Sequence, residues 1–163
     1  MFKYFFVTVF IFLFTSCQHT TTPEPQSQIV LGDNIEGVQI GDDSSTVVRK
    51  LGKPSYIGDG DMNGYIFQYT EGRLAYTFVT ISKDPLFGLG TISVSLEGPY
   101  AGKTKDGIKI KCEREFVLGK IGVPDTSFAG SPLTYDIYYF NKNGFTFTYE
   151  NQIVHRIIMS KPK

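Results

Sequence analysis

The chain has 163 residues, and its sixteen basic and sixteen acidic side chains give a formal net charge of zero. A balanced surface builds no field that attracts a polyanion, which argues against nucleic acid as a partner. Fourteen Phe and ten Tyr, with no Trp, favour antiparallel β-structure over a helical bundle. The length suits one domain, or two small repeats that share a core.

Residues 1–16 have the layout of a signal peptide, with Lys3 near the start, a run of about ten apolar residues and then small residues. The run is too short to span a hydrocarbon core of about 30 Å, so we expect it to be removed. It leads into Phe14-Thr-Ser-Cys17, which resembles the lipobox of bacterial lipoproteins, with Phe14 where that family usually has Leu. The resemblance implies a mature chain that begins at Cys17 and carries acyl chains there, palmitate among them. An ordinary cleaved signal with an incidental cysteine is the alternative.

The lipid on Cys17 implies a membrane partner, because two or three acyl chains give lasting attachment where one does not. Residues 17–30 are polar and contain Pro, which predicts a flexible tether. Gln18 provides no acidic retention signal of the kind found in some inner-membrane lipoproteins, which favours the outer membrane. We therefore expect a lipid-anchored protein of the cell envelope, with its folded part in the periplasm or exposed at the surface.

The motif that begins at Gly37 returns at Gly107 in one register. The further matching pairs are Ile40 with Ile110, Val47 with Val117, Leu51 with Ile121, Gly52 with Gly122 and Pro54 with Pro124. Chance does not easily maintain such a register. The pattern predicts a tandem repeat, with unit 1 at residues 31–97, a linker at 98–106 and unit 2 at 107–163.

In the first unit, Asp42 or Asp43 is placed to cap a short helix over residues 44–51, and Gly52 is placed to end it. The spacing of Val47, Val48 and Leu51 puts them on one helical face, which must be buried. Alternating and aromatic segments predict the strands that follow, at residues 65–69, 73–79 and 90–96.

The second unit repeats this plan, with a helix over 113–121 whose expected apolar face carries Phe116, Val117 and Ile121. Cys112 takes the place of the capping Asp42. Strands are expected at 135–140, 145–149 and 153–159. The predicted fold is therefore α+β: two tandem repeats, each a short helix followed by a three-stranded antiparallel meander, packed as one compact body.

A helix announced by Gly-x-x-Ile and closed by Leu-Gly-x-Pro, ahead of an antiparallel meander, resembles the small lipoprotein of the outer-membrane β-barrel assembly machine. Its tandem form resembles β-lactamase inhibitor protein. The matching framework positions are Gly37, Ile40, Leu51, Gly52, Pro54 and their partners in the second unit. The resemblance implies a non-catalytic protein-binding module, in envelope assembly, and the alternative is an inhibitor of secreted enzymes or a ligand-capturing module. No stretch transfers a binding site, so the protein partner is not identified.

Catalytic signatures are missing from the sequence, which has no Gly-x-Ser-x-Gly elbow and no phosphate-binding loop. Cys112 is a conceivable nucleophile, but His155, the one histidine outside the tether, stands at no defined Cys-His spacing from it. Both residues are more often structural at such positions, and together they supply too few soft ligands for zinc. We expect no enzyme activity and no cofactor.

The segment Asp59-Gly-Asp-Met-Asn-Gly64 matches the opening of a calcium-binding loop. The match then fails, because Thr70 stands where the bidentate Glu is required. A polar turn is the favoured interpretation of Asp59–Asn63, and no metal site is predicted.

Aromatic residues stand on both faces of two of the predicted strands: Tyr65, Tyr69, Tyr138 and Phe140. A strand with two aromatic faces is either covered by helices or available to a partner. Core packing is favoured, because a small sheet needs aromatic bulk to fill its interior.

Overall fold

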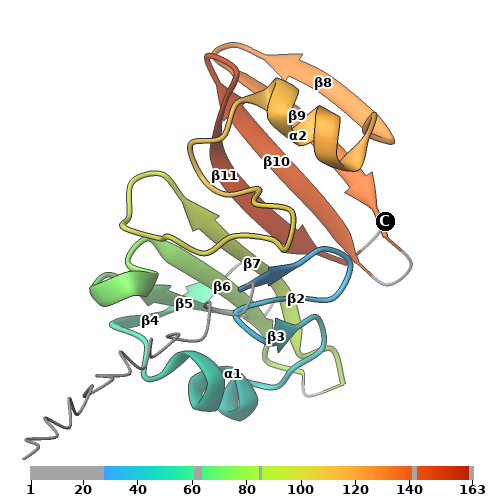
Figure 1. Cartoon of the computed structure of the whole chain (residues 1–163). Helices are drawn as coiled ribbons and strands as arrows, with labels where there is room; N and C mark the ends of the chain where they lie inside the picture. The colour runs from blue at the N-terminus through green and yellow to red at the C-terminus, as the bar shows by residue number, and fades with distance from the viewer. Residues whose placement is uncertain (1–27, 61–63, 85, 141–142, 162–163) are drawn as a thin grey trace, which may run out of the picture.

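The computed structural model describes residues 28–60, 64–84, 86–140 and 143–161. Its main feature is one antiparallel sheet of eight strands in the order β4-β5-β6-β7-β11-β10-β9-β8 (Figure 1). The strands are β4 (Tyr56–Gly60), β5 (Gly64–Tyr69), β6 (Thr77–Ser82), β7 (Leu89–Ser95), β8 (Thr126–Gly130), β9 (Leu133–Tyr139), β10 (Gly144–Glu150) and β11 (Ile153–Ser160).

A second, smaller sheet near the start of the described chain consists of β1 (Ile29–Val30), β2 (Asn34–Ile35) and β3 (Val38–Gln39), in that order. Two α-helices complete the fold, α1 (Ser44–Leu51) and α2 (Arg114–Ile121), together with the 3-10 helix η1 (Gly72–Leu74).

This architecture shows that the predicted fold class is wrong. The chain is mostly β, and its long strands form one continuous sheet instead of two three-stranded meanders that each follow a helix. Two sheet strands were missed, β4 and β8, and so was the whole β1–β3 sheet. The reason is local: β4 and β8 are the edges of the sheet and are mostly exposed, so they carry no alternation of apolar and polar residues.

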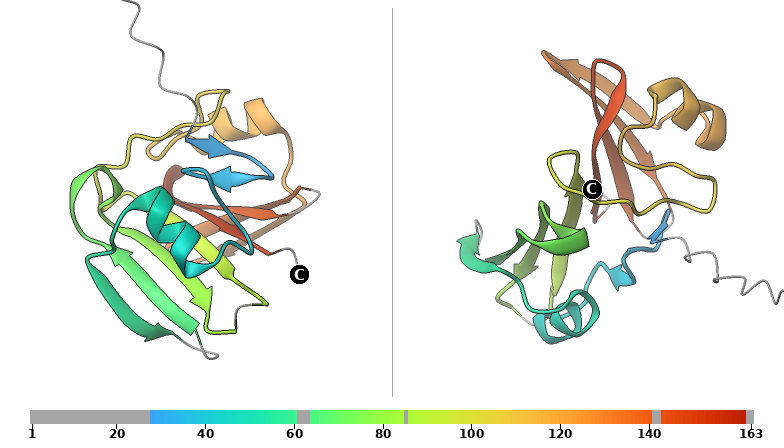
Figure 2. Two further views of the ribbon diagram at one scale, coloured as in Figure 1. Left: turned by 90° about the horizontal axis from the view of Figure 1, so that it is seen from below. Right: turned by 60° about the vertical axis from the view of Figure 1, so that its left-hand side comes forward.

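One face of the large sheet carries the core. A row of paired residues crosses seven strands on this face: Ile57, Phe67, Val79, Ile92, Met159, Phe145 and Tyr138. All but Ile57, which lies at the sheet edge, are buried. The helices, the β1–β3 sheet and the segment 97–113 all lie in front of this face (Figures 1 and 2). In the described part of the chain, the fold is therefore a sheet covered on one side.

Helix α1 agrees with the sequence prediction in its bounds, its cap and its apolar face. The Asp43 carboxylate accepts a hydrogen bond of 2.7 Å from the Thr46 backbone N–H, which holds the pKa of Asp43 below its ordinary value. Val47 and Leu51 are buried, and Val48 packs against the core. The helix ends at Gly52, whose φ of 87° suits glycine.

Helix α2 agrees only in part. Val117 is buried and Ile121 packs against the core, but Phe116 is exposed and lies under Lys120, whose Nζ is 5.4 Å from the ring centroid. Glu113 takes the cap position and makes no side-chain capping bond. Hydrogen bonds from Arg114 to Asp136 of β9 also hold the helix to the sheet, so a wide apolar stripe is not required.

The segments predicted as a tether and as a linker both contribute to the core. Ile29 of β1 is fully buried, so the folded part begins within the predicted tether of residues 17–30. In the predicted linker 98–106, Tyr100 and Thr104 are buried, and the chain continues into buried Ile108. Within the described ranges, neither α-helix has the length and apolarity needed to cross a bilayer.

Candidate binding surface

The face of the large sheet that points away from the helices is the candidate binding surface, and we call it the open face. One row of paired residues crosses all eight strands: Tyr56, Gln68, Phe78, Ser93, Ile158, Thr146, Ile137 and Thr126. Ile66, Thr80, Thr91, Ser160 and Tyr139 form part of a second row, and Arg156, Tyr135 and Phe128 part of a third. Side chains of directly paired residues share one face, so these residues line one surface.

The open face is nearly uncharged. Arg156 is the one ionic side chain among the residues just named, and its guanidinium lies 3.9 Å from Glu97. The remaining positions hold aliphatic, aromatic, hydroxyl and amide side chains. Interface centres in proteins are depleted in charge and enriched in aromatic residues, and this surface has the same composition.

Four large apolar side chains of this face do not belong to the core. Ile66, Phe78, Ile137 and Ile158 are absent from the buried cluster and from the partly buried residues packed against it. Neighbouring side chains of the sheet leave each of them half-buried. A row of apolar groups that the described residues leave uncovered is available for contact with another molecule.

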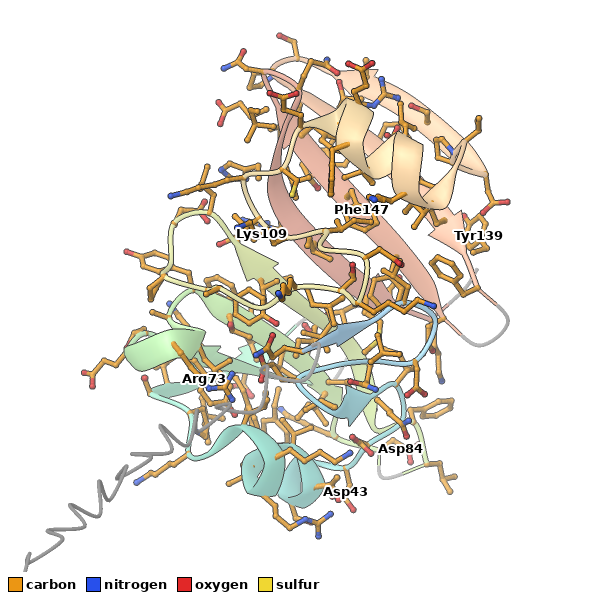
Figure 3. All side chains as sticks on the ribbon, in the orientation of Figure 1. Asp43, Arg73, Asp84, Lys109, Tyr139 and Phe147 are labelled. Carbon is orange, nitrogen blue, oxygen red and sulfur yellow. The ribbon has the colours of Figure 1, made fainter. Side chains whose placement is uncertain are left out.

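Aromatic side chains stand at both ends of the open face. Tyr56 on edge strand β4 is 59% exposed, and Phe128 on the opposite edge strand β8 is 50% exposed. Phe128 stacks on Tyr135, with ring centroids 4.7 Å apart, and exposed Tyr139 lies at the end of β9 (Figure 3). Aromatic residues are frequent hot spots of protein interfaces because they bury a large area at a low entropic cost.

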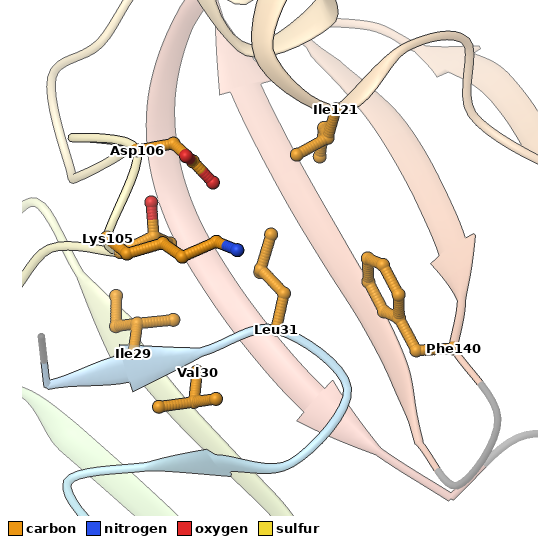
Figure 4. A pocket seen from close by; sticks show the side chains of 8 residues that line it. Ile29, Val30, Leu31, Lys105, Asp106, Ile121 and Phe140 are labelled. Carbon is orange, nitrogen blue, oxygen red and sulfur yellow. The ribbon is translucent and has the colours of Figure 1, made fainter.

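On the covered side, a pocket of about 320 Å³ opens between β1, the segment that leads to α2, and the end of β9. It is lined by Ile29, Val30, Leu31, Thr104, Lys105, Asp106, Ile121 and Phe140. Figure 4 shows five apolar side chains around the space and the charged groups of Lys105 and Asp106 on one side of it. The pocket can take an apolar group that carries a polar end.

A buried ion pair positions α2 above the sheet. Arg114, the first residue of α2, donates from Nε to Asp136 Oδ2 at 2.7 Å and from Nη2 to Asp136 Oδ1 at 2.9 Å. Ser127 Oγ of β8 donates to the same Oδ1 at 2.7 Å. Asp136 is completely buried, so these three bonds replace the water it lost. The hydrogen bond to Asp136 also raises the pKa of Arg114.

Two tyrosines near this ion pair have raised pKa values. Burial, with the charge of Asp136 as a smaller cause, raises the pKa of Tyr138 to about 12. The same causes raise the pKa of Tyr149, whose hydroxyl is buried and finds no hydrogen-bond partner among the described residues. Both hydroxyls therefore stay protonated at neutral pH. We interpret this cluster as structural, because Arg114 uses its fork on Asp136.

The predicted site residues are placed as follows. Cys17, the predicted lipid attachment site, lies outside the described residues. Cys112 is half-buried, and its Sγ lies 3.8 Å from the carbonyl oxygen of Gly107. His155 Nε2 is 3.6 Å from Glu97 Oε1 and 3.9 Å from Glu150 Oε2. The thiol and the imidazole thus contact different groups, and no catalytic pair is formed by these contacts.

The calcium-like segment is only partly described, because residues 61–63 lie outside the described ranges. Asp59 belongs to β4 and binds Lys83 Nζ at 2.8 Å, and Gly60 pairs with Gly64 across the hairpin. Over the described part of the chain, no three His, Cys, Asp or Glu side chains are grouped so that they could hold a metal ion.

The four aromatic residues singled out in the sequence all lie on the covered side of the sheet. Tyr69 and Tyr138 are buried and donate hydrogen bonds of 3.1 Å to the carbonyl oxygens of Gly52 and Gly122, which end the two helices. Phe140 lines the pocket, and Tyr65 is partly exposed. The residues of the open face were missed, although strands with apolar residues on both faces were the signal that one face needs another cover.

No protein-family model matches this chain, and no curated protein sequence is significantly similar to it. Solved structures do share its fold. An extracellular protein containing an SCP domain from Bacillus anthracis matches with a TM-score of 0.60 and 15% identity, over 83% of this chain and 48% of that chain. A cysteine-rich secretory protein from Staphylococcus aureus matches with a TM-score of 0.58 and 10% identity, over 84% and 48% of the two chains.

A DUF4309 family protein from Bacillus subtilis matches with a TM-score of 0.54 and 13% identity, over 80% of this chain and 88% of that one. The present chain thus spans about half the length of the first two proteins and most of the third. At these identities the likeness shows a shared fold and nothing more.

Proposed function

We propose that this chain is a lipid-anchored bacterial envelope protein that binds another protein through the open face of its sheet and catalyses no reaction. The observation that carries the binding role is the uncharged row from Tyr56 to Thr126, with Phe78 and Ile158 left outside the core. A surface of this kind costs little to desolvate and gains apolar burial when it is covered.

The signal-like residues 1–16 and the lipobox-like ending at Cys17 support export and lipid attachment. Two of the structures with a similar fold come from proteins described as extracellular or secretory, which agrees with an exported chain. The resemblance of the repeated motif to the barrel-assembly lipoprotein makes envelope assembly the process that we propose, with the outer membrane as the favoured site.

The binding role is tested by crosslinking in intact cells. A photoreactive residue at Phe78, on the open face, should capture a partner that mass spectrometry can identify. The matched control is Val123, which is highly exposed in the turn after α2 and outside the open face. Equal capture from both positions, or none from Phe78, would show that the open face is not a binding surface.

A second experiment asks whether a charged residue on the open face prevents crosslinking to the partner. Ile158→Glu places a carboxylate in the middle of the open face, where it would be buried against a partner, and should lower capture at least about tenfold. Val123→Glu adds the same charge elsewhere and should leave capture unchanged. Equal melting temperatures for the two variants and the parent chain would exclude misfolding as the cause.

The membrane anchor is tested by labelling cells with palmitate. Cys17→Ser should abolish the label and release the protein from the membrane fraction, because the acyl chains provide the attachment. Cys112→Ser is the control, and it should keep both the label and the location. Retention of the label in Cys17→Ser would contradict the proposed anchor.

A second candidate function, the capture of a small ligand, rests on the pocket beside β1. Its apolar wall and its single charged side suit an amphiphile with a short apolar tail and a polar head. Leu31→Trp should fill the space and weaken binding of a fluorescent fatty acid at least about tenfold, whereas Leu86→Trp, a substitution at an exposed loop residue, should not. Unchanged binding in Leu31→Trp would exclude this pocket.

A further inference from the structure

The outer edge of β8 differs from most sheet edges in that none of the described residues covers it. β8 is the last strand of the eight-stranded sheet, and all five of its residues are exposed. Its sequence, Thr126-Ser-Phe-Ala-Gly130, contains no charge and no proline, and its register with β9 has no bulge. Proteins usually protect an edge strand with a charged residue, a proline or a bulge, because the unpaired backbone groups of an edge can pair with another strand.

The hydrogen bonds of β9 show which groups of β8 point outward. Phe140 exchanges both of its backbone bonds with Asn143 in the turn to β10, so even-numbered residues of β9 face β10 and odd-numbered ones face β8. The odd residues Ile137, Tyr135 and Leu133 pair with Thr126, Phe128 and Gly130. The N–H and C=O groups of the remaining two, Ser127 and Ala129, therefore point away from the sheet.

These outward groups are symmetric about Phe128. Suppose that a second β8 runs antiparallel to the first, with Ser127 of one copy opposite Ala129 of the other. This pair exchanges two backbone hydrogen bonds, and the twofold axis generates a second, identical pair. All four outward N–H and C=O groups are then used. No like charges meet across the axis, since the strand carries none.

The same register places the two Phe128 residues directly opposite each other as a non-hydrogen-bonded pair. In such a pair the Cα atoms are about 4.5 Å apart, close enough for the two rings to touch. Each Phe128 already stacks on its own Tyr135 at 4.7 Å. The pairing would thus continue a row of aromatic rings across the axis on the open face.

The opposite edge strand, β4, provides the contrast. Ser55 N–H bonds to the Gln68 carbonyl, so Gln68 faces β4, and Ile57 and Asp59 are the β4 residues that point outward. Asp59 puts a carboxylate on this edge and is bound to Lys83 at 2.8 Å. A charged pair of this kind is a common protection against edge pairing.

From these observations we propose that two copies of this chain associate through antiparallel pairing of their β8 strands, centred on Phe128, to form one continuous sheet across a twofold axis. This self-association uses the edge of the sheet, and it does not depend on the proposed binding role of the open face or on the lipid at Cys17.

The test is disulfide trapping with the full chain. Phe128→Cys places two thiols on opposite sides of the axis at a separation that suits a disulfide. Oxidation with copper phenanthroline should give a covalent dimer on a non-reducing gel. The control is Tyr56→Cys, a position at the β4 edge that is somewhat more exposed than Phe128. It should give no dimer above the level of the parent chain, whose Cys112 is half-buried.

A second variant distinguishes strand pairing from disulfides that form when two monomers meet at random. Ala129→Pro removes an outward N–H that the monomer does not use, so the fold should keep its melting temperature. In the dimer the change removes two of the four hydrogen bonds, and the yield of Phe128→Cys dimer should fall at least about tenfold. Ile57→Pro, the same change on β4, should leave the yield unaltered.

Light scattering on the chain without added cysteines supplies an independent measurement. The molar mass should rise with concentration toward that of a dimer and no further, because the twofold axis closes the assembly. A strictly monomeric chain, equal trapping at Tyr56→Cys, or growth into longer assemblies would each overturn the proposal. Each of these results leaves the capture experiment on the open face unaffected.

Discussion

At the level of single residues, the buried polar groups place the strictest requirements on their neighbours, because they need hydrogen-bond partners. Asp136 is fully buried and accepts three hydrogen bonds, two of them from Arg114. A buried carboxylate is tolerated only when charge and hydrogen bonds replace its water. This need explains why α2 begins with an arginine and how the helix is held without a broad apolar face.

Removal of the Asp136 carboxylate should therefore be costly. Asp136→Ala leaves Arg114 half-enclosed without its partner, and we expect a loss on the order of 3 kcal/mol in the free energy of unfolding, measured with urea. Glu115→Ala, an exposed acidic position in the first turn of the same helix, should change it by less than about 0.5 kcal/mol. Equal effects would mean that the ion pair does not anchor α2.

Buried tyrosines make the fold sensitive to alkaline pH. Burial raises the pKa of Tyr69, Tyr100, Tyr138 and Tyr149 above the ordinary value of 10.0. The folded chain holds these protons more tightly than the unfolded chain, so their contribution to stability is complete below about pH 10 and is lost as the pH rises. For Tyr138 the loss extends to about pH 12.

The measurement is a titration of tyrosinate absorbance beside the free energy of unfolding. Four tyrosines should ionise later than the ordinary value, together with a loss of stability above about pH 10. Tyr138→Phe should remove one late-ionising group and weaken the loss. Stability that does not change through this range would contradict the assignment.

At the level of elements, the two helices end in the same way. Gly52 and Gly122 have φ values of 87° and 86°, and their N–H groups bond to Val48 and Leu118. Their carbonyl oxygens accept hydrogen bonds from Tyr69 and Tyr138 in the sheet. The repeated Leu/Ile-Gly-x-Pro motif thus marks a helix end that is tied to a neighbouring strand.

Two glycine substitutions test this point in opposite directions. Gly52→Ala meets no atom within 4 Å but requires a φ that alanine disfavours, so unfolding should become easier by about 1–2 kcal/mol. Gly119→Ala also has open space and lies inside α2, where alanine should stabilise by up to about 1 kcal/mol. Thermal unfolding of both variants is the measurement, and melting temperatures that shift in the same direction would contradict the prediction.

At the level of the whole molecule, β7 and β11 join the two groups of four strands. Their pairing runs from Arg156–Ser95 to Ser160–Thr91, and Ile92, Val94, Ile157 and Met159 are fully buried beneath it. The core is one cluster that includes residues from both sides of this seam and from β1–β3. Such continuity predicts that the described part unfolds as a single cooperative unit.

Ile157→Ala tests this cooperativity. The side chain is completely buried at the seam, so the cavity should cost about 2–5 kcal/mol in the free energy of unfolding. Far-ultraviolet circular dichroism and tyrosine fluorescence should report one shared transition in both proteins. Two separated transitions would show that the halves of the sheet unfold independently.

The helices were the most predictable elements. Capping residues and glycine stops act within a few residues, and α1 occupies the range that those signals predicted. Parts of the six predicted strands also lie within β5, β6, β7, β9, β10 and β11. The β6 prediction began too early, because Arg73 and Leu74 form η1 and the strand starts at Thr77.

The candidate sites were far less predictable. The pocket is lined by Leu31, Lys105 and Phe140, which are far apart in the sequence, and no local sequence pattern predicts that they lie close together. The open face depends on which side of the sheet the helices cover. In β5 the neighbours Ile66 and Phe67 are both apolar, so the sequence could not show that only Phe67 belongs to the core.

The sequence by itself determined the short-range features: the cap of α1, the repeated Gly-x-Pro ends of both helices and most strand positions, because these depend on backbone preferences and on neighbours a few residues away. Only the tertiary structure decided that two groups of four strands join through β7 and β11 into one sheet, and that the described helices and the β1–β3 sheet cover a single face of it. Strand order and coverage arise from long-range pairing and packing, in which many arrangements satisfy the same local pattern.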